Sequence, residues 1–195
     1  MVTKLDMEKS FDRVRHSFLL KVMKKLGFDS TFTKWIALWI ASPWKYPLVN
    51  GQVVGFFKYS RGLRQGYPLS PFIYIIMANS LSRRWEHDRE IHKLPGIRFK
   101  EGIKSINHWK IVDENILLGS ASVMISKIFK VNLENFLSTS GAAKNKDKIH
   151  IYTWNISPHK AKNIEEIMGF RVVRDWKDFN YLGIPNFLRR AAHYA

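Results

Sequence analysis

Signals for helices and for strands alternate along this chain, and that alternation constrains its fold more than any other feature. Helical apolar spacing is interrupted repeatedly by short β-type runs and turn residues. Mixed elements with several antiparallel hairpins favour an α+β fold, in which helices pack on one face of an antiparallel sheet. We predict helices over 12–26, 30–41, 72–86, 125–140 and 158–168, and strands over 1–6, 45–50, 52–58, 97–106, 108–118, 149–154, 171–173 and 179–184.

Turn and cap residues fix several of these boundaries. Asn50-Gly51 is the strongest short signal for a hairpin turn. Ser70 as N-cap and Pro71 at the first helical position predict the start of a helix. Gly141 and Gly169 suit the ends of the two later helices.

Composition narrows the function classes. The 195 residues suffice for one domain with a real core, and the absence of cysteine excludes disulfides, thiolate metal sites and a cysteine nucleophile. No apolar run approaches the ~20 residues of a membrane helix. Acidic residues within the first ten positions argue against a signal peptide. The net charge of +16 favours a polyanionic partner, such as nucleic acid.

Three carboxylates stand out in so basic a chain. Asp6 ends a strand-like segment, and Asp113 and Glu114 form the tip of an apolar hairpin. Carboxylates that converge at one point repel one another unless a cation joins them. Hard divalent ions such as Mg²⁺ take oxygen ligands and accept phosphate as a further partner. The residues alone leave two alternatives open, a metal site for nucleotidyl transfer and an ordinary polar turn.

Five motifs, in order, cover nearly the whole chain: Leu5–Val14 (LDMEKSFDRV), Arg61–Pro71 (RGLRQGYPLSP), Asn107–Glu114, Ser140–Lys148 and Tyr181–Gly183 (YLG). Together they resemble the reverse transcriptases of LINE-type (non-LTR) retrotransposons, most closely copies from plant genomes. The resemblance implies a polymerase-palm-like fold. It also implies RNA-directed DNA synthesis with two Mg²⁺ or Mn²⁺ ions, an RNA template, a DNA primer and a deoxynucleoside triphosphate.

The resemblance assigns the metal ions to Asp6, Asp113 and, as a third ligand, Glu114. Phe11 would lie under the sugar of the incoming nucleotide and exclude a 2′-hydroxyl, although a core aromatic is the simpler interpretation. Lys148 would lie near the active site, or is one lysine of a basic loop.

The remaining implied contacts are with substrate strands. Gln65 and Gly66 would line the nucleotide and template pocket, where glycine lets backbone approach closely. Arg61 and Arg64 would contact phosphate or remain solvated charges. Tyr181, Leu182 and Gly183 would support the primer, with a plain edge strand as the alternative.

Several positions depart from the family pattern. The hairpin reads Ile111-Val112-Asp113-Glu114 where the family has aromatic-Ala-Asp-Asp, and Tyr67 replaces a small cysteine. Because a misplacement of about 1 Å can cost on the order of 10²-fold in rate, we predict a weak or inactive copy. The alternatives are a basic nucleic-acid-binding module without catalysis and a non-functional pseudogene product.

The expected domain plan is a palm over residues 1–186 and a frayed tail over 187–195. The chain starts five residues before Asp6 and little follows Tyr181–Gly183, so the resemblance implies that fingers and thumb are missing. The resemblance implies localisation in the nucleus or cytoplasm. The sequence itself argues against secretion, because acidic residues lie within its first ten positions, and against a membrane partner, because no helix shows a clean basic amphipathic face.

Overall fold

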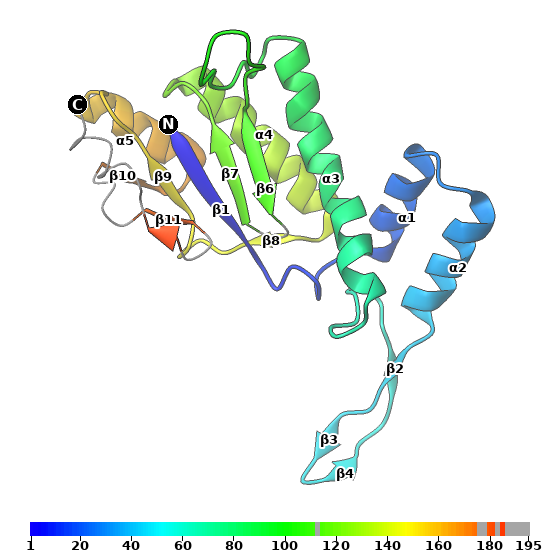
Figure 1. Cartoon of the computed structure of the whole chain (residues 1–195). Coiled ribbons are helices and arrows are strands. Elements are labelled where there is room, and N and C mark those ends of the chain that lie inside the picture. The colour runs from blue at the N-terminus through cyan, green and yellow to red at the C-terminus, as the bar shows by residue number, and fades with distance from the viewer. Residues whose placement is uncertain (112–113, 175–178, 182–183, 186–195) are drawn as a thin grey trace. The chain divides into compact units, whose positions relative to one another are not determined.

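The main element of this computed structural model is a mixed sheet (Figure 1). The structure describes residues 1–111, 114–174, 179–181 and 184–185. The strand order is β10-β9-β1-β7-β6, with β8 also paired to β1. The bounds are β1 (Val2–Glu8), β6 (His108–Ile111), β7 (Glu114–Leu118), β8 (Ala143–Lys144), β9 (His150–Tyr152) and β10 (Arg171–Val173).

The predicted α+β class is confirmed, and the β1, β7, β6 and β9 pairings are antiparallel. One pairing departs from an all-antiparallel sheet, because β10 runs parallel to β9. The helix α5 (Pro158–Met168) connects these two strands. Parallel neighbours need such a crossover, whereas a short turn suffices for antiparallel ones.

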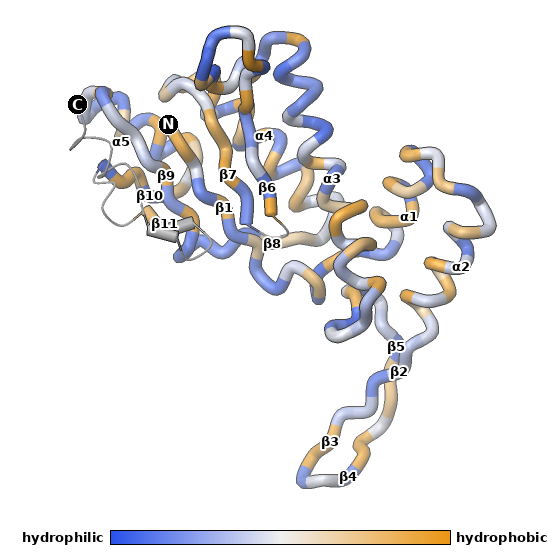
Figure 2. The backbone as a smooth tube through the Cα atoms, in the orientation of Figure 1, coloured by the Kyte–Doolittle hydropathy of each residue, from blue (hydrophilic) through white to orange (hydrophobic). Residues whose placement is uncertain are grey.

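The chain divides into two compact units. Unit 1 comprises Met1–Asp6, Arg84–Asn132 and Lys144–Ala195, and unit 2 comprises Met7–Arg83 and Leu133–Ala143. Two long helices, α3 (Leu69–Glu90) and α4 (Val123–Ser140), contribute to both units. Figure 2 shows α3 mostly hydrophobic in its N-terminal half and hydrophilic toward its C-terminus.

Unit 1 buries one face of the sheet beneath helices. Alternate residues of a strand point to opposite faces, and directly paired residues share a face. Thr3, Leu117 and Ile151 share the face that is fully buried. The Trp85 ring of α3 lies 5.3 Å from His108 of β6 and 6.4 Å from Phe129 of α4. The other face, which we call the open face, carries Lys4, Asp6, Trp109, Ile111, Glu114 and Ile116.

Unit 2 holds α1 (His16–Lys25), α2 (Ser30–Ala41) and a long hairpin. Asp29 caps α2, because its carboxylate accepts the backbone N–H groups of Thr31 and Phe32. The hairpin turns at Asn50 and Gly51, both at positive φ (51° and 80°), as predicted. Its paired strands are β2 (Trp44–Lys45) with β5 (Phe57–Lys58), and β3 (Leu48–Val49) with β4 (Gln52–Val53).

Several sequence predictions of local structure were wrong. Ser70 is not an N-cap, because α3 already begins at Leu69. The first helix begins at His16, not at Asp12, because backbone groups of Phe11 and Val14 accept hydrogen bonds from residues 62 and 63 instead of starting a helix. The expected strand over 97–106 is a loop closed by a bridge between Ile97 and Ile106. Within this loop Phe99 and Ile103 are 68% and 50% exposed, so these apolar side chains do not pack as a strand face would.

The C-terminal elements are β11 (Asn180–Tyr181) and β12 (Ile184–Pro185), which pair with each other. The single strand expected over 179–184 was therefore wrong, because these two short strands replace it. The predicted tail over 187–195 lies outside the described residues. Among the helices that the structure describes, none combines the length and the hydropathy that a bilayer crossing needs.

Candidate active site

The strand pairing brings two of the predicted metal ligands to the same place. Asp6 near the end of β1 pairs directly with Glu114, the first residue of β7. Directly opposite residues of an antiparallel pair project from the same face. Both carboxylates therefore belong to the open face, and Asp6 is largely buried at 8% exposure. Asp113 lies outside the described residues.

Two lysines are ion-paired with these carboxylates. The Lys148 ammonium lies 3.8 Å from Asp6 Oδ2, and the Lys4 ammonium lies 3.7 Å from Glu114 Oε1. Lys148 is 65% exposed, so solvent screens its pair, whereas Lys4 and Glu114 are both mostly buried. The backbone N–H of Asn145 also donates to the Asp6 carbonyl at 3.0 Å, which anchors the loop that carries Lys148.

A complete metal centre is not present among the described residues, where no group of three or more histidine or acidic side chains could hold an ion. Asp6 and Glu114 supply two carboxylates of the oxygen type that Mg²⁺ prefers. These donors suit a divalent ion, and the remaining predicted ligand, Asp113, is adjacent to Glu114 in the sequence.

Within unit 2, the first two motifs meet through their backbones. The N–H groups of Gly62 and Leu63 donate to the carbonyls of Val14 (2.7 Å) and Phe11 (2.8 Å). The His16 ring nitrogen Nε2 contacts the Gly62 carbonyl oxygen at 2.8 Å. Gly62 has φ +91°, and a Cβ there would lie 2.7 Å from the Asp12 carbonyl oxygen. Only glycine allows this approach.

The predicted nucleotide-pocket residues of unit 2 have protein partners. The half-buried Phe11 ring stacks on Tyr74 of α3, with centroids 4.9 Å apart. The Gln65 amide donates to both carboxylate oxygens of Asp12 at 3.2 Å. Gly66 has φ +81° with open space where a Cβ would be, so its backbone conformation is what requires glycine.

The two predicted phosphate-contacting arginines differ in their surroundings. Arg64 Nη1 donates to the Tyr67 hydroxyl at 2.7 Å, and its guanidinium also lies 4.5 Å from the centre of the Tyr67 ring. Tyr67, a departure from the family pattern, thus holds Arg64 in place. Arg61 is exposed.

The fourth motif joins the same junction. Arg15 donates from its backbone N–H to the Ser140 carbonyl (2.8 Å) and from Nη1 to the Ser138 carbonyl (2.6 Å). Gly141 has φ +82°, and a Cβ there would lie 2.6 Å from the Arg13 carbonyl oxygen. We call residues 11–15, 62–65 and 138–141 the motif junction.

Comparison with known proteins decides the family. The model of the family described as reverse transcriptase (RNA-dependent DNA polymerase) matches residues 1–185. The chain belongs to the reverse transcriptase family. Enzymes of this family generally use divalent metal ions.

Two relatives indicate the branch of the family. Over 147 residues, or 72% of this chain, the reverse transcriptase domain is 26% identical to a retrovirus-related Pol polyprotein from type-1 retrotransposable element R2 of Popillia japonica, and it covers 24% of that protein. Over 67 residues, 34% of this chain, it is 40% identical to an uncharacterized mitochondrial protein of Arabidopsis thaliana, covering 55% of it. The chain thus spans about half or less of these relatives. It is a reverse transcriptase domain of the non-LTR retrotransposon type, as predicted.

A solved structure supports the fold. Telomerase from Candida albicans, in complex with a fragment of telomeric RNA, matches with a TM-score of 0.57 at 15% identity. The match covers 76% of this chain and 26% of that one. It confirms the palm-like α+β architecture of the reverse transcriptase domain.

The predicted primer-support residues are only partly described. Tyr181 belongs to β11, which pairs with β12, and Leu182 and Gly183 lie outside the described residues. Their role stays a prediction.

Sequence reasoning missed three residues that contact the predicted site residues. Lys4 is ion-paired with Glu114, Asp12 accepts from Gln65, and Tyr74 stacks on Phe11. Strand alternation alone could have found Lys4, because it stands two residues before Asp6 on the same face. The partners of Gln65 and Phe11 come from distant segments and leave no local pattern.

Proposed function

We propose that Asp6, Asp113 and Glu114 form a divalent-metal site for nucleotidyl transfer that supports little or no synthesis in this copy. The observation that carries the proposal is the direct pairing of Asp6 with Glu114 across β1 and β7. It brings carboxylates from two distant motifs to one face of the sheet. The substrates would be those of the family: an RNA template, a DNA primer and a deoxynucleoside triphosphate.

Two bound ions would activate the attacking primer hydroxyl and stabilise the leaving phosphate oxygen. The other proposed contacts come from this chain's own residues. Phe11 and Gln65, with Gly66, would shape the nucleotide and template pocket, and Arg61 and Arg64 would face phosphate. Lys148, beside Asp6, would neutralise phosphate charge, and Tyr181–Gly183 would support the primer.

Low activity is proposed because of Glu114. Its side chain is one methylene longer than the aspartate of the family pattern, and it is ion-paired with Lys4 at 3.7 Å. A carboxylate held by a lysine is a poorer metal ligand, because metal and ammonium compete for the same oxygens. Catalysis is sensitive to such displacements.

Primer extension on an RNA template with Mg²⁺ or Mn²⁺ tests the proposal. We expect near-background synthesis by the wild type, and at least a tenfold gain in Glu114→Asp that disappears when Asp6→Asn is added. Asp147→Asn, an exposed acid on the loop after Asn145, is the matched control and should change nothing. Robust wild-type synthesis would contradict the predicted weakness. Synthesis that persists unchanged in Asp6→Asn would contradict the site itself.

Calorimetry with Mn²⁺ separates metal binding from turnover. Binding that is lost in Asp6→Asn but kept in Asp147→Asn supports the carboxylate site without requiring synthesis. Equal binding by the three proteins would mean that Asp6 holds no ion.

A second candidate function is nucleic-acid binding without catalysis, favoured by the charge and by one side chain. The chain carries +16, and Trp109, 54% exposed on the open face, offers a ring on which a base can stack. Such binding releases counterions and weakens steeply with salt. We expect at least about a hundredfold loss of affinity for single-stranded RNA between 50 and 200 mM salt. A salt-insensitive affinity would exclude this function.

A further inference from the structure

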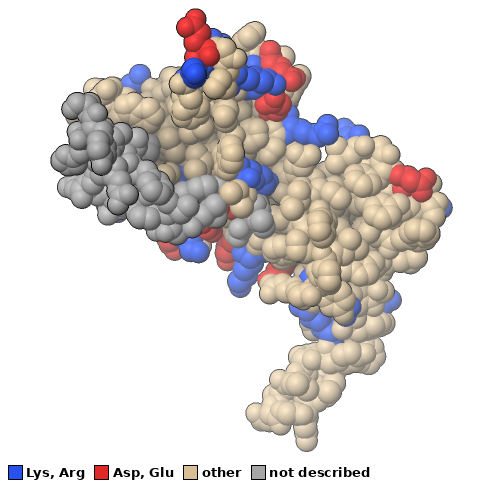
Figure 3. Space-filling model, viewed as in Figure 1, with Lys and Arg blue, Asp and Glu red and all other residues tan. Residues whose placement is uncertain are grey.

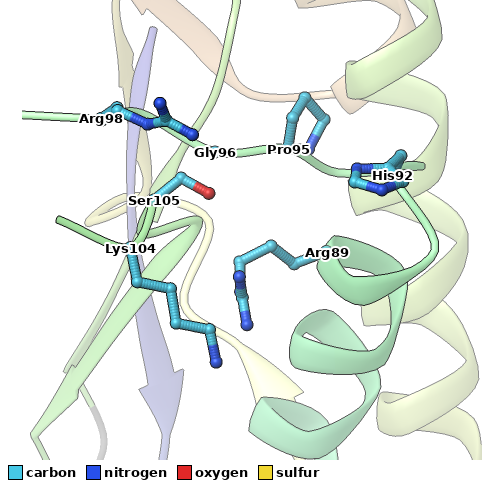
Figure 4. A pocket seen from close by; sticks show the side chains of 7 residues that line it. All are labelled: Arg89, His92, Pro95, Gly96, Arg98, Lys104 and Ser105. Atoms are coloured by element: carbon cyan, nitrogen blue, oxygen red, sulfur yellow. The ribbon is translucent and has the colours of Figure 1, made fainter. Parts of the chain in front are cut away.

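A cavity lies in unit 1, at the end of the sheet away from Asp6 and Glu114. It has a volume of about 350 Å³ and lies between the C-terminal turn of α3 and the loop that leads into β6. Ser105 stands three residues before β6 begins, whereas Glu114 lies at the hairpin turn where β6 ends. The lining residues, shown in Figure 4, are Arg89, His92, Pro95, Gly96, Arg98, Lys104 and Ser105.

The walls of this cavity are fixed by backbone contacts. Ile97 and Ile106 exchange two hydrogen bonds, of 2.8 and 2.9 Å, which close the loop. The buried Asn107 amide donates to the carbonyls of Trp85 (2.6 Å) and Leu94 (3.4 Å). Gly96, at φ +74°, lies so close to the Ile106 carbonyl that a Cβ would overlap it. A ligand would therefore meet a largely preformed site, which favours binding because little order remains to be imposed.

The lining is strongly cationic. Arg89, Arg98 and Lys104 contribute three positive charges, and His92 is a fourth basic group. The Glu86 carboxylate is ion-paired with two of these groups. Arg89 donates to both of its oxygens, at 2.9 and 2.5 Å, and the Lys104 ammonium donates to Oε1 at 3.0 Å. Arg98 has neither an ion pair nor a hydrogen bond within the described part of the chain. The lining itself thus carries an excess of positive charge, while Glu86 and Glu90 act on Arg89 from outside it.

The helix dipole explains only part of this excess. Cations are stabilised near the C-terminus of a helix, which accounts for Arg89 in the last turn of α3. Arg98 and Lys104 come from the facing loop, and Figure 4 shows them across the cavity from Arg89. Glu86 also holds the Arg89 guanidinium, only 10% exposed, in a fixed orientation. An arginine fixed in this way presents its remaining N–H groups with little loss of side-chain freedom.

We propose that this cavity binds a phosphate group, through Arg98, Arg89 and Lys104 with the Ser105 hydroxyl. Arginine and hydroxyl donors match phosphate oxygens in geometry and charge. The volume admits a phosphate together with the group that carries it. The phosphate could be free or part of a nucleic-acid strand, and the test separates the two.

Titration calorimetry of the intact protein tests the site. EDTA in the buffer removes divalent metal ions, so that they contribute nothing to the binding measured. The probes are inorganic phosphate and a single-stranded 12-nucleotide RNA. We expect Arg98→Gln and Lys104→Gln each to weaken binding about tenfold, the effect of losing one charge-assisted hydrogen bond. The matched control is Arg83→Gln, an exposed arginine of α3 that does not line the cavity. It should change the affinity less than twofold.

The outcomes are distinct. Arg98-dependent binding of inorganic phosphate assigns a free phosphate, and Arg98-dependent binding of RNA alone assigns a strand phosphate. Equal weakening by Arg98→Gln and Arg83→Gln would mean that only net charge matters and would overturn the site, as would no weakening by either cavity variant. Asp6→Asn should bind both probes like the wild type, so failure of the proposed catalytic site leaves this test unaffected.

Discussion

Unit 2 contains both a tightly constrained region and a loosely held one. In the motif junction, backbones from three distant segments approach so closely that Gly62 and Gly141 have no space for a Cβ. In the hairpin 44–58, each strand pair is only two residues long, and Gly55 has open space around its Cα. The junction is specified by contacts between distant residues, whereas the hairpin is specified by its own turn.

Apolar content does not explain which of the two regions is packed, because the hairpin is the more apolar of the two. Residues 46–57 contain no charged residue, and Figure 3 shows no charge around the hairpin tip. Yet Leu48, Val53 and Phe56 are 61–67% exposed. A contiguous exposed apolar surface on a soluble protein marks an interaction or aggregation site. Burial therefore follows from which segments meet, not from hydrophobicity along one segment.

The largest expected effect is a loss of stability at a junction glycine. Gly141→Ala places a Cβ 2.6 Å from the Arg13 carbonyl in a left-handed conformation, so we expect a loss of about 4 kcal/mol. Gly55→Ala in the hairpin has similar φ (+70°) but no neighbour within 4 Å, so it should cost about 1 kcal/mol or less. Urea denaturation of both variants measures the difference. Equal losses would remove the distinction between the regions.

Much of the fold could be predicted because its signals are local. Ser157, Pro158 and Gly169 define the two ends of α5, and Asn50-Gly51 defines the hairpin turn. The start of α1 could not be predicted, because residues 11–14 are held by residues 62 and 63, some fifty positions later in the sequence. The parallel pairing of β10 with β9 joins residues that are closer in the sequence, on either side of α5, yet no local signal gives its direction.

The candidate site also has one part that could be predicted from the sequence and one part that could not. The family resemblance of the motifs predicted that Asp6 would join the acidic tip of the β6–β7 hairpin, and the register brings Asp6 opposite Glu114. The Lys4 ion pair with Glu114 and the hold of Tyr67 on Arg64 depend on side-chain positions that no motif encodes. The cationic cavity was not predicted from the sequence either, because Arg89 and Arg98 are separated by a loop.

A half-buried lysine in the sheet of unit 1 gives the next largest expected effect. Burial lowers the pKa of Lys110 from 10.5 to about 8. Between pH 8 and 10.5 the unfolded chain binds this proton more tightly than the folded protein does, so stability should rise with pH. The rise should reach up to about 3 kcal/mol, and Lys110→Met should lack it. Urea midpoints from pH 7.5 to 10.5 measure it, and parallel profiles for the two proteins would contradict this assignment.

Replacing a buried serine of the second motif should cause a smaller loss of stability. The Ser70 hydroxyl, almost fully buried, donates to the Arg64 carbonyl. Ser70→Ala should cost about 1–2 kcal/mol, because that hydrogen bond is lost in a buried setting. The control is Ser42→Ala, just before the hairpin, where an exposed hydroxyl makes a 3.4 Å contact with the Trp39 carbonyl. Its cost should stay below about 0.5 kcal/mol. Thermal denaturation of both variants checks the order, and a larger loss in Ser42→Ala would reverse it.

The smallest expected effect on stability is in the hairpin itself. The double change Val53→Thr and Phe56→Ser makes two exposed apolar side chains polar and keeps the Asn50-Gly51 turn. Because these side chains are 61% and 66% exposed, little burial is lost and the free energy of unfolding should change by less than about 0.5 kcal/mol. Solubility should rise, because the exposed apolar surface shrinks. Light scattering against concentration, with urea denaturation of the same samples, measures both. A loss of stability above 1 kcal/mol would show that the hairpin packs in solution and that the contrast with the motif junction is wrong.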